Sequence, residues 1–122
     1  MFTIGVDIVE VERIRQAVTR WGDRFLSRVY TLDELAYCGQ RMTSLAGRWA
    51  AKEAVSKALV RTAGLEWHDC EVLSGAHGEP LLHLTGTVAD AAAAMGIDHW
   101  AVSLSHDGHM AIAVVLASRG SR

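Results

Sequence analysis

The stretch of residues 45–59 constrains the fold of this chain more than any other. Its letters, LAGRWAAKEAVSKAL, are mostly alanine and leucine with no proline, a composition that favours a helix. Charged residues lie among the small apolar ones at helical spacing, so that Glu53 and Lys57 share one face and Arg48 and Lys52 share another. The small side chains let a chain segment or a ligand come close, while the charges suit a metal ion and phosphates. A solvated helix with ordinary ion pairs explains this segment equally well.

The first residues are typical of a β-strand that contains an unusual acid. Residues 2–9 alternate, with Phe2, Ile4, Val6 and Ile8 on one face and Thr3, Gly5, Asp7 and Val9 on the other. Strands seldom contain aspartate, and burying an unpaired carboxylate is costly, so a cation bound at Asp7 would remove that cost. Gly5 leaves space for something to approach the backbone. The alternative is that the strand ends at Asp7 and the carboxylate caps a helix that begins near Val9 or Glu10.

The remaining elements are predicted from periodicity and turn residues. Thr31 followed by Glu34 indicates a capping box at the start of a helix, and the long helix is expected to stop near Arg61. The other predicted elements are helices at 10–20, 23–29 and 86–95, and strands at 69–74, 80–85, 99–105 and 110–117. Helices mixed with hairpin-connected strands indicate a single α+β unit.

Six segments, taken in order, resemble the holo-[acyl-carrier-protein] synthases, the small bacterial 4′-phosphopantetheinyl transferases. The segments are 5–13, 25–34, 46–59, 67–72, 78–81 and 102–107. The resemblance runs from Ile4 to about Leu116, nearly the whole chain. It implies an α+β fold in which an antiparallel sheet packs against a long helix and which assembles as a homotrimer. It also implies one domain at 1–117 followed by a flexible tail at 118–122.

The resemblance implies an enzyme that transfers the 4′-phosphopantetheine arm of coenzyme A to a serine of apo-acyl carrier protein, in support of fatty acid biosynthesis. The other product is adenosine 3′,5′-bisphosphate. Asp7 and Glu53 match the family's metal ligands, so Mg²⁺ is the expected ion. Lys57 is expected to reach the pyrophosphate. Arg48 and Lys52 are expected to contact the outer phosphates of coenzyme A.

Ser105 and His106 complete the expected site. By resemblance both lie at the coenzyme A site, where His106 contacts a phosphate and assists proton transfer. In larger relatives two copies of the fold are fused, and the Ser-x-Ser-His motif of one half faces the acids of the other. We therefore expect a site between subunits, with Asp7, Glu53 and Lys57 from one protomer and Ser105 and His106 from its neighbour. The general base stays open between a metal-bound water, Glu53 and the pair of His106 and Asp107.

The charge distribution points to an acidic protein partner. The net charge is −2, which argues against general nucleic-acid binding, yet five arginines and two acids lie between Val11 and Tyr30. Such a basic patch suits an acidic carrier protein, although a solvated helical face would look the same. The arginines expected to dock the carrier are Arg13, Arg20, Arg24 and Arg28.

Two other function classes remain. A non-catalytic module that binds coenzyme A or a carrier protein would not need both Asp7 and Glu53, and a metal-dependent pyrophosphohydrolase would not use the arginines. The two cysteines, Cys38 and Cys70, are too few for a disulfide scaffold, which favours a reduced, cytoplasmic protein. No apolar run approaches membrane-spanning length, so no membrane partner is expected.

Overall fold

The structure, a computed structural model, describes residues 1–61 and 63–120. Its elements are β1 (Phe2–Glu10), α1 (Val11–Trp21), α2 (Asp23–Val29), α3 (Leu32–Cys38), α4 (Met42–Ala58), the 3₁₀ turn η1 (Trp67–Asp69), β2 (Cys70–Ser74), β3 (Pro80–Leu84), α5 (Gly86–Ala94), β4 (His99–His106) and β5 (Met110–Ser118). The predicted α+β class is confirmed. Among the described residues, no helix is both long and apolar enough to cross a bilayer.

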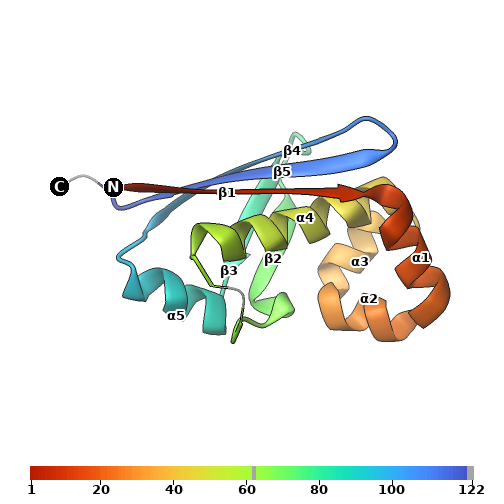
Figure 1. Cartoon of the computed structure of the whole chain (residues 1–122), viewed down its shortest axis with the longest axis horizontal. Helices are drawn as coiled ribbons and strands as arrows, with labels where there is room; N and C mark the ends of the chain where they lie inside the picture. The colour runs from red at the N-terminus through yellow and green to blue at the C-terminus, as the bar shows by residue number, and fades with distance from the viewer. Residues whose placement is uncertain (62, 121–122) are drawn as a thin grey trace.

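A three-stranded antiparallel sheet carries the long helix. Its strand order is β1-β5-β4, and β2 and β3 form a separate antiparallel pair. Helix α4 lies along one face of the larger sheet, and the other helices lie on that same side (Figure 1). The predicted packing of an antiparallel sheet on a long helix is therefore confirmed.

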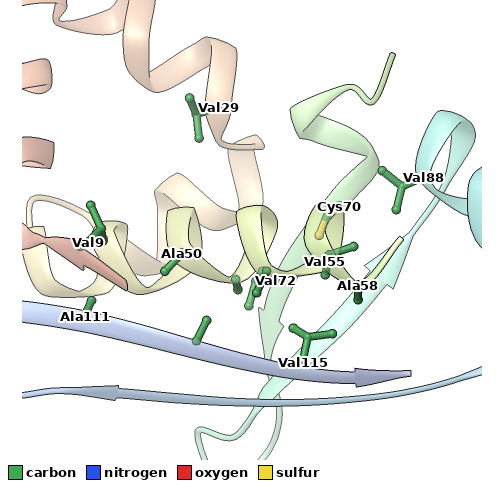
Figure 2. Close-up of a cluster of buried hydrophobic side chains, with 14 of the residues drawn as sticks. Val9, Val29, Ala50, Val55, Ala58, Cys70, Val72, Val88, Ala111 and Val115 are labelled. Atoms are coloured by element: carbon green, nitrogen blue, oxygen red, sulfur yellow. The ribbon is translucent and has the colours of Figure 1, made fainter. Parts of the chain in front are cut away.

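The core lies between α4 and the strands. Alanines on α4 are fully buried, and Val55 belongs to the same buried cluster as Val72 of β2 and Val115 of β5 (Figure 2). Gly5 permits the closest approach, because a β-carbon there would stand only 1.8 Å from the carbonyl oxygen of Ala54. The segment that approaches the Gly5 backbone is thus α4, and the small residues of the two elements let their backbones meet.

The two faces of β1 have opposite environments. One face of β1 lies against α4 and carries Thr3, Gly5, Asp7 and Val9. The other face points away from α4 and carries Phe2, Ile4, Val6 and Ile8. The alternation predicted from the sequence is confirmed, but the face that carries the larger apolar side chains is the exposed one. Val114 and Leu116 of β5 are also exposed. We call these six apolar residues of β1 and β5 the outer sheet face.

Some predicted boundaries were wrong. Helix α4 ends at Ala58, about one turn before the expected stop near Arg61. Ser118, predicted to begin a flexible tail, is the last residue of β5, and the Gly120 amide donates to Asp98. Residues 121 and 122 of that predicted tail lie outside the described residues. The capping box is confirmed, since Thr31 and Glu34 bond reciprocally at the start of α3.

Candidate active site between β1 and α4

The site begins with an aspartate in the middle of a strand. β1 continues through Asp7 to Glu10, so the alternative in which Asp7 caps a helix is wrong. The Lys57 ammonium of α4 donates to Asp7 Oδ1 at 2.9 Å and to the Val6 carbonyl at 3.1 Å. The other carboxylate oxygen, Asp7 Oδ2, is buried and has no hydrogen-bond partner. An unpartnered buried oxygen costs free energy, so it requires an explanation.

Glu53 lies one helical turn before Lys57 and presents a second carboxylate to the same region. Its pKa is raised above the ordinary value, first because the side chain is half-buried and second because the negative charge of Asp7 is close. Lys57 opposes this effect with its positive charge. The structure therefore brings Asp7, Glu53 and Lys57 together, as the expected site requires.

The two carboxylates fit a hard divalent cation. Mg²⁺ is commonly bound in proteins by one or two carboxylates, with waters and substrate phosphates completing its coordination. Asp7 Oδ2 provides a free acceptor, and a cation would offset the repulsion between Asp7 and Glu53. No group of three or more His, Cys, Asp or Glu residues that could hold a metal occurs among the described residues. The protein alone would thus leave most coordination positions to water and substrate.

A cavity of about 140 Å³ opens beside Glu53. Its walls include Lys52, Glu53 and Ser56 on α4, and Leu65, Trp67 and Val88 on the opposite side. We call it the Glu53 cavity. It combines acidic and hydroxyl groups with apolar walls, a lining typical of a small-molecule site.

Lys52 does not reach this region as a free cation. Its ammonium donates to Glu34 Oε1 at 2.9 Å and also to the carbonyl oxygens of Trp67 and Cys70. An ammonium has three donors, and all three are occupied. The side chains of Lys52 and Glu34 are 1% and 0% exposed. The prediction that Lys52 contacts outer phosphates of coenzyme A is therefore corrected: Lys52 belongs to a buried ion pair.

Arg48 lies on a different side of α4 from Glu53. Its Nη2 donates to Ser74 Oγ at 2.9 Å, and its guanidinium lies 4.5 Å from the centre of the Tyr37 ring. The Nε of Arg48 is buried without a partner. The pKa of Tyr37 is lowered, chiefly by its hydrogen bond with Ser74 and then by the charges of Arg48 and Arg41. The buried Nε–H of Arg48 is thus left without an acceptor.

Ser105 and His106 are not joined to the Asp7 group within one chain. Ser105 of β4 lies opposite Ile112 of β5, which lies opposite Ile8 of β1, so these three side chains point to the same side of the sheet. Asp7 is in the adjacent row across the strands, together with Leu104, and points to the other side. Ser105 therefore faces the same side of the sheet as the outer sheet face, away from α4. His106 is exposed at the end of β4, with β5 between it and β1.

The four expected docking arginines are all exposed on α1 and α2. They are Arg13, Arg20, Arg24 and Arg28. Two of them flank an exposed aromatic ring that the sequence analysis missed: Arg20 and Arg24 lie 5.0 and 5.9 Å from the centre of the Trp21 ring. A hollow of about 350 Å³ is lined by Trp21 of α1 and by Arg24, Phe25 and Arg28 of α2. The signal in the sequence was an aromatic residue inside a run of arginines.

Known proteins resemble this chain over nearly its full length. A profile of the 4′-phosphopantetheinyl transferase superfamily matches residues 3–115. A Herpetosiphon aurantiacus protein named holo-[acyl-carrier-protein] synthase is 48% identical over 124 residues, covering 95% of this chain and 98% of that protein. A Dehalococcoides mccartyi protein of the same name is 44% identical, covering 96% and 98%.

A solved structure extends the likeness to three dimensions. The holo-[acyl-carrier-protein] synthase of Helicobacter pylori, solved in complex with coenzyme A, superimposes with a TM-score of 0.86. The two proteins are 36% identical, and the match covers 94% of this chain and 99% of that one. With the same fold and relatives that share almost half of its residues, the chain belongs to the holo-[acyl-carrier-protein] synthases of the 4′-phosphopantetheinyl transferase superfamily.

Proposed function

We propose that this chain transfers the 4′-phosphopantetheine arm of coenzyme A to a serine of an apo-acyl carrier protein, releasing adenosine 3′,5′-bisphosphate and supporting fatty acid biosynthesis. The observation that carries the proposal is the buried, unpartnered Oδ2 of Asp7 beside Glu53 and Lys57. The relatives of this chain are named holo-[acyl-carrier-protein] synthases, and the Helicobacter pylori protein among them was solved in complex with coenzyme A.

Asp7 and Glu53 are our proposed ligands for Mg²⁺. When bound, the ion neutralises negative charge on the pyrophosphate oxygens. Lys57 is the proposed catalytic cation of the chain: half of its side chain is exposed, so its ammonium can contact a phosphate beside Asp7. There it stabilises the negative charge that develops on the leaving group. The chain thus contributes charge and alignment to phosphoryl transfer.

Arg48 is our candidate for an outer phosphate of coenzyme A, because its Nε lacks a partner. Its planar guanidinium can bind a phosphate with two parallel hydrogen bonds. Lys52 is not part of this proposal.

We propose that the active enzyme is a homotrimer with the site between neighbouring subunits. The outer sheet face supports this assembly, since a monomer would leave Phe2, Ile4 and Ile8 more than half exposed. Ser105 lies on the same side of the sheet as these residues, where a neighbour would meet it. Ser105 and His106 would then contact coenzyme A bound at the neighbour's Asp7 and Glu53.

The exposed arginines of α1 and α2 are proposed to bind the acidic carrier protein. Opposite charges on two surfaces speed association and fix the orientation of docking. We further propose a cytoplasmic location, supported by the buried free thiols of Cys38 and Cys70.

The test is intact-mass analysis of an apo-acyl carrier protein incubated with this protein, coenzyme A and Mg²⁺. We expect a mass increase of one phosphopantetheine arm. The increase should be absent with Asp7→Ala, with Glu53→Ala and without the metal. Coenzyme A binding without transfer to several carriers would favour a binding module, and hydrolysis of coenzyme A without a carrier would favour a pyrophosphohydrolase.

A further inference from the structure

The buried ion pair of Lys52 and Glu34 joins four elements of the fold. Glu34 belongs to the first turn of α3, where Oε1 also accepts the Thr31 amide at 2.9 Å. Its other oxygen accepts the Val72 amide of β2 at 2.9 Å. Every oxygen of this carboxylate is thus engaged, and the ammonium of Lys52 completes the pair from α4.

Lys52 extends the connection to a segment that neither helix contains. Its ammonium donates to the carbonyl oxygen of Trp67, the first residue of η1, and to that of Cys70, the first residue of β2. Trp67 also stacks on Trp49 of α4, with ring centres 5.9 Å apart. The ammonium therefore fastens both ends of the 67–70 segment to α4.

The energetics of the pair suggest a role beyond stability. Removing two charges from water costs several kcal/mol per ion, and buried pairs replaced by apolar residues often leave stability unchanged or improved. A buried ion pair therefore does not by itself explain why this arrangement is useful. What apolar side chains could not reproduce are the two hydrogen bonds to the carbonyl oxygens of Trp67 and Cys70.

The fastened segment is a wall of the Glu53 cavity. Trp67 and Cys70 line it on one side, while Lys52 and its sequence neighbour Glu53 line it on the other. The length of the Lys52 hydrogen bonds therefore sets the separation of the two walls. A segment that moved away from α4 would widen the cavity directly beside the proposed metal ligand.

We propose that Lys52, held by Glu34, is a positioning residue that anchors the 67–70 segment to α4 and thereby shapes the Glu53 cavity for coenzyme A. This proposal rests on the proposed function, in which coenzyme A binds beside Glu53. Lys52 does not touch the substrate. It acts through the backbone of Trp67 and Cys70, and its loss weakens binding of coenzyme A while leaving carrier docking on α1 and α2 intact.

Two variants distinguish the effect of the Lys52 hydrogen bonds to the 67–70 segment from the effect of the buried charges. Glu34→Gln removes the carboxylate charge but retains the Lys52 ammonium and its two carbonyl bonds. The double variant Glu34→Gln with Lys52→Met removes both charges and both bonds, so no buried charge is left unpaired. Steady-state kinetics are measured for both substrates below the melting temperature of each protein. Binding of coenzyme A is measured by calorimetry, and the Trp49–Trp67 stack is followed by near-ultraviolet circular dichroism.

We expect the double variant to raise the KM and the Kd for coenzyme A by about tenfold relative to Glu34→Gln. The KM for the carrier should remain within about twofold, and the signal of the tryptophan stack should weaken. A general loss of folded enzyme would lower the apparent kcat and leave both KM values unchanged. A folded double variant with an unchanged KM and Kd for coenzyme A would overturn the proposal.

A second measurement needs no variant. Coenzyme A added to the unaltered protein should slow hydrogen exchange at the backbone amides of 67–70, because the anchored segment forms the wall that the ligand contacts. Unchanged exchange there at saturating coenzyme A would overturn the proposal. Transfer activity of the unaltered protein, measured in parallel, reports separately on the proposed function.

Discussion

Gly5 of β1 lies directly against the backbone of Ala54 on α4, so close that a β-carbon at position 5 would stand 1.8 Å from the Ala54 carbonyl oxygen. Asp7 follows two residues later on the same face of β1, and Glu53 immediately precedes Ala54. The contact between a strand and a helix therefore fixes the spacing of the two carboxylates. Through this one glycine, the stability of the fold is coupled to the spacing of the two proposed metal ligands.

Replacing Gly5 with alanine should damage both properties. The added methyl group meets main-chain atoms, which cannot rotate away, so α4 must move off β1. We expect a loss of about 3 kcal/mol in the free energy of unfolding, measured with urea, and weaker Mg²⁺ binding by calorimetry.

Gly47→Ala is the matched control on α4. A β-carbon there would meet only Leu104 Cδ1, at an ordinary 3.7 Å. Since alanine favours a helix over glycine by about 1 kcal/mol, this variant should be as stable as the natural protein or more so. A Gly5→Ala protein of undiminished stability would contradict the close contact.

Glu53→Gln should inactivate the enzyme and yet stabilise the metal-free protein near pH 7. The pKa of Glu53 is raised from the ordinary 4.5, mainly by burial and then by the charge of Asp7. The folded state thus binds the proton more tightly than the unfolded state. As pH rises from 4.5 through the raised pKa, this group makes the protein less stable. Glutamine has no such charge, so the variant should have the higher melting temperature without metal.

Magnesium provides the contrasting condition. Mg²⁺ should raise the melting temperature of the natural protein and have little effect on Glu53→Gln. Glu12→Gln, the same change at an exposed residue paired with Arg15, should alter stability by less than about 0.5 kcal/mol. A lower melting temperature for metal-free Glu53→Gln would show that the Glu53 charge is not repelled in the folded protein.

Local signals in the sequence predicted the elements, and the family resemblance predicted one part of the site. The alternation of β1 and the alanine-rich composition of α4 are properties of short segments, and so is the capping box of Thr31 and Glu34. The family resemblance predicts that Asp7 and Lys57, which are fifty residues apart, share one site, and the two side chains are in contact at 2.9 Å.

The role of Lys52 could not be predicted from its own segment. On a helix of small residues beside Glu53, it has the appearance of a ligand contact. Its actual partners come from α3 and from the backbone of η1 and β2, which only the tertiary fold brings to it. The orientation of β1 was equally inaccessible, since alternation defines two faces without saying which one meets α4.

Val60 carries backbone strain that can be removed. Its φ of 56° lies in the left-handed region, which is costly for a β-branched residue, and its side chain is exposed. Val60→Gly should raise the free energy of unfolding by about 1 kcal/mol, because the relief of strain exceeds the entropy cost of glycine. Val60→Ala keeps a β-carbon and should gain less. Urea titration compares the two, and a less stable Val60→Gly protein would argue against strain at this position.

Charge reversal at Arg24 should impair carrier docking specifically. Arg24 is exposed and lies beside the Trp21 ring. Arg24→Glu places a negative charge against an acidic partner, so we expect the KM for the apo-carrier to rise about tenfold at low salt while the KM for coenzyme A stays constant. The difference should shrink at high salt. Arg119→Glu, one residue after the end of β5, is the matched charge change and should leave both values unaltered. The C-terminal end of the chain lies at the opposite end of the molecule from α2 (Figure 1).

Mixing two inactive variants should restore activity if neighbouring subunits share each site. Asp7→Ala removes a residue of the β1 and α4 group, whereas His106→Ala removes one at the end of β4, which a single chain does not bring to Asp7. In randomly mixed trimers, a site is intact when a His106→Ala subunit supplies Asp7 and its neighbour, an Asp7→Ala subunit, supplies His106. With equal amounts, about a quarter of the sites meet this condition.

The mixture of Asp7→Ala with Glu53→Ala is the decisive control. Both residues come from the same subunit, so every subunit in that mixture carries a broken metal site, and no activity should return. The subunits are mixed by partial unfolding and refolding, and transfer to the carrier is followed by intact mass. A shared site requires recovery in the first mixture alone. If neither mixture recovers although mixed trimers form, His106 acts within its own chain, and the outer sheet face serves assembly without completing the site.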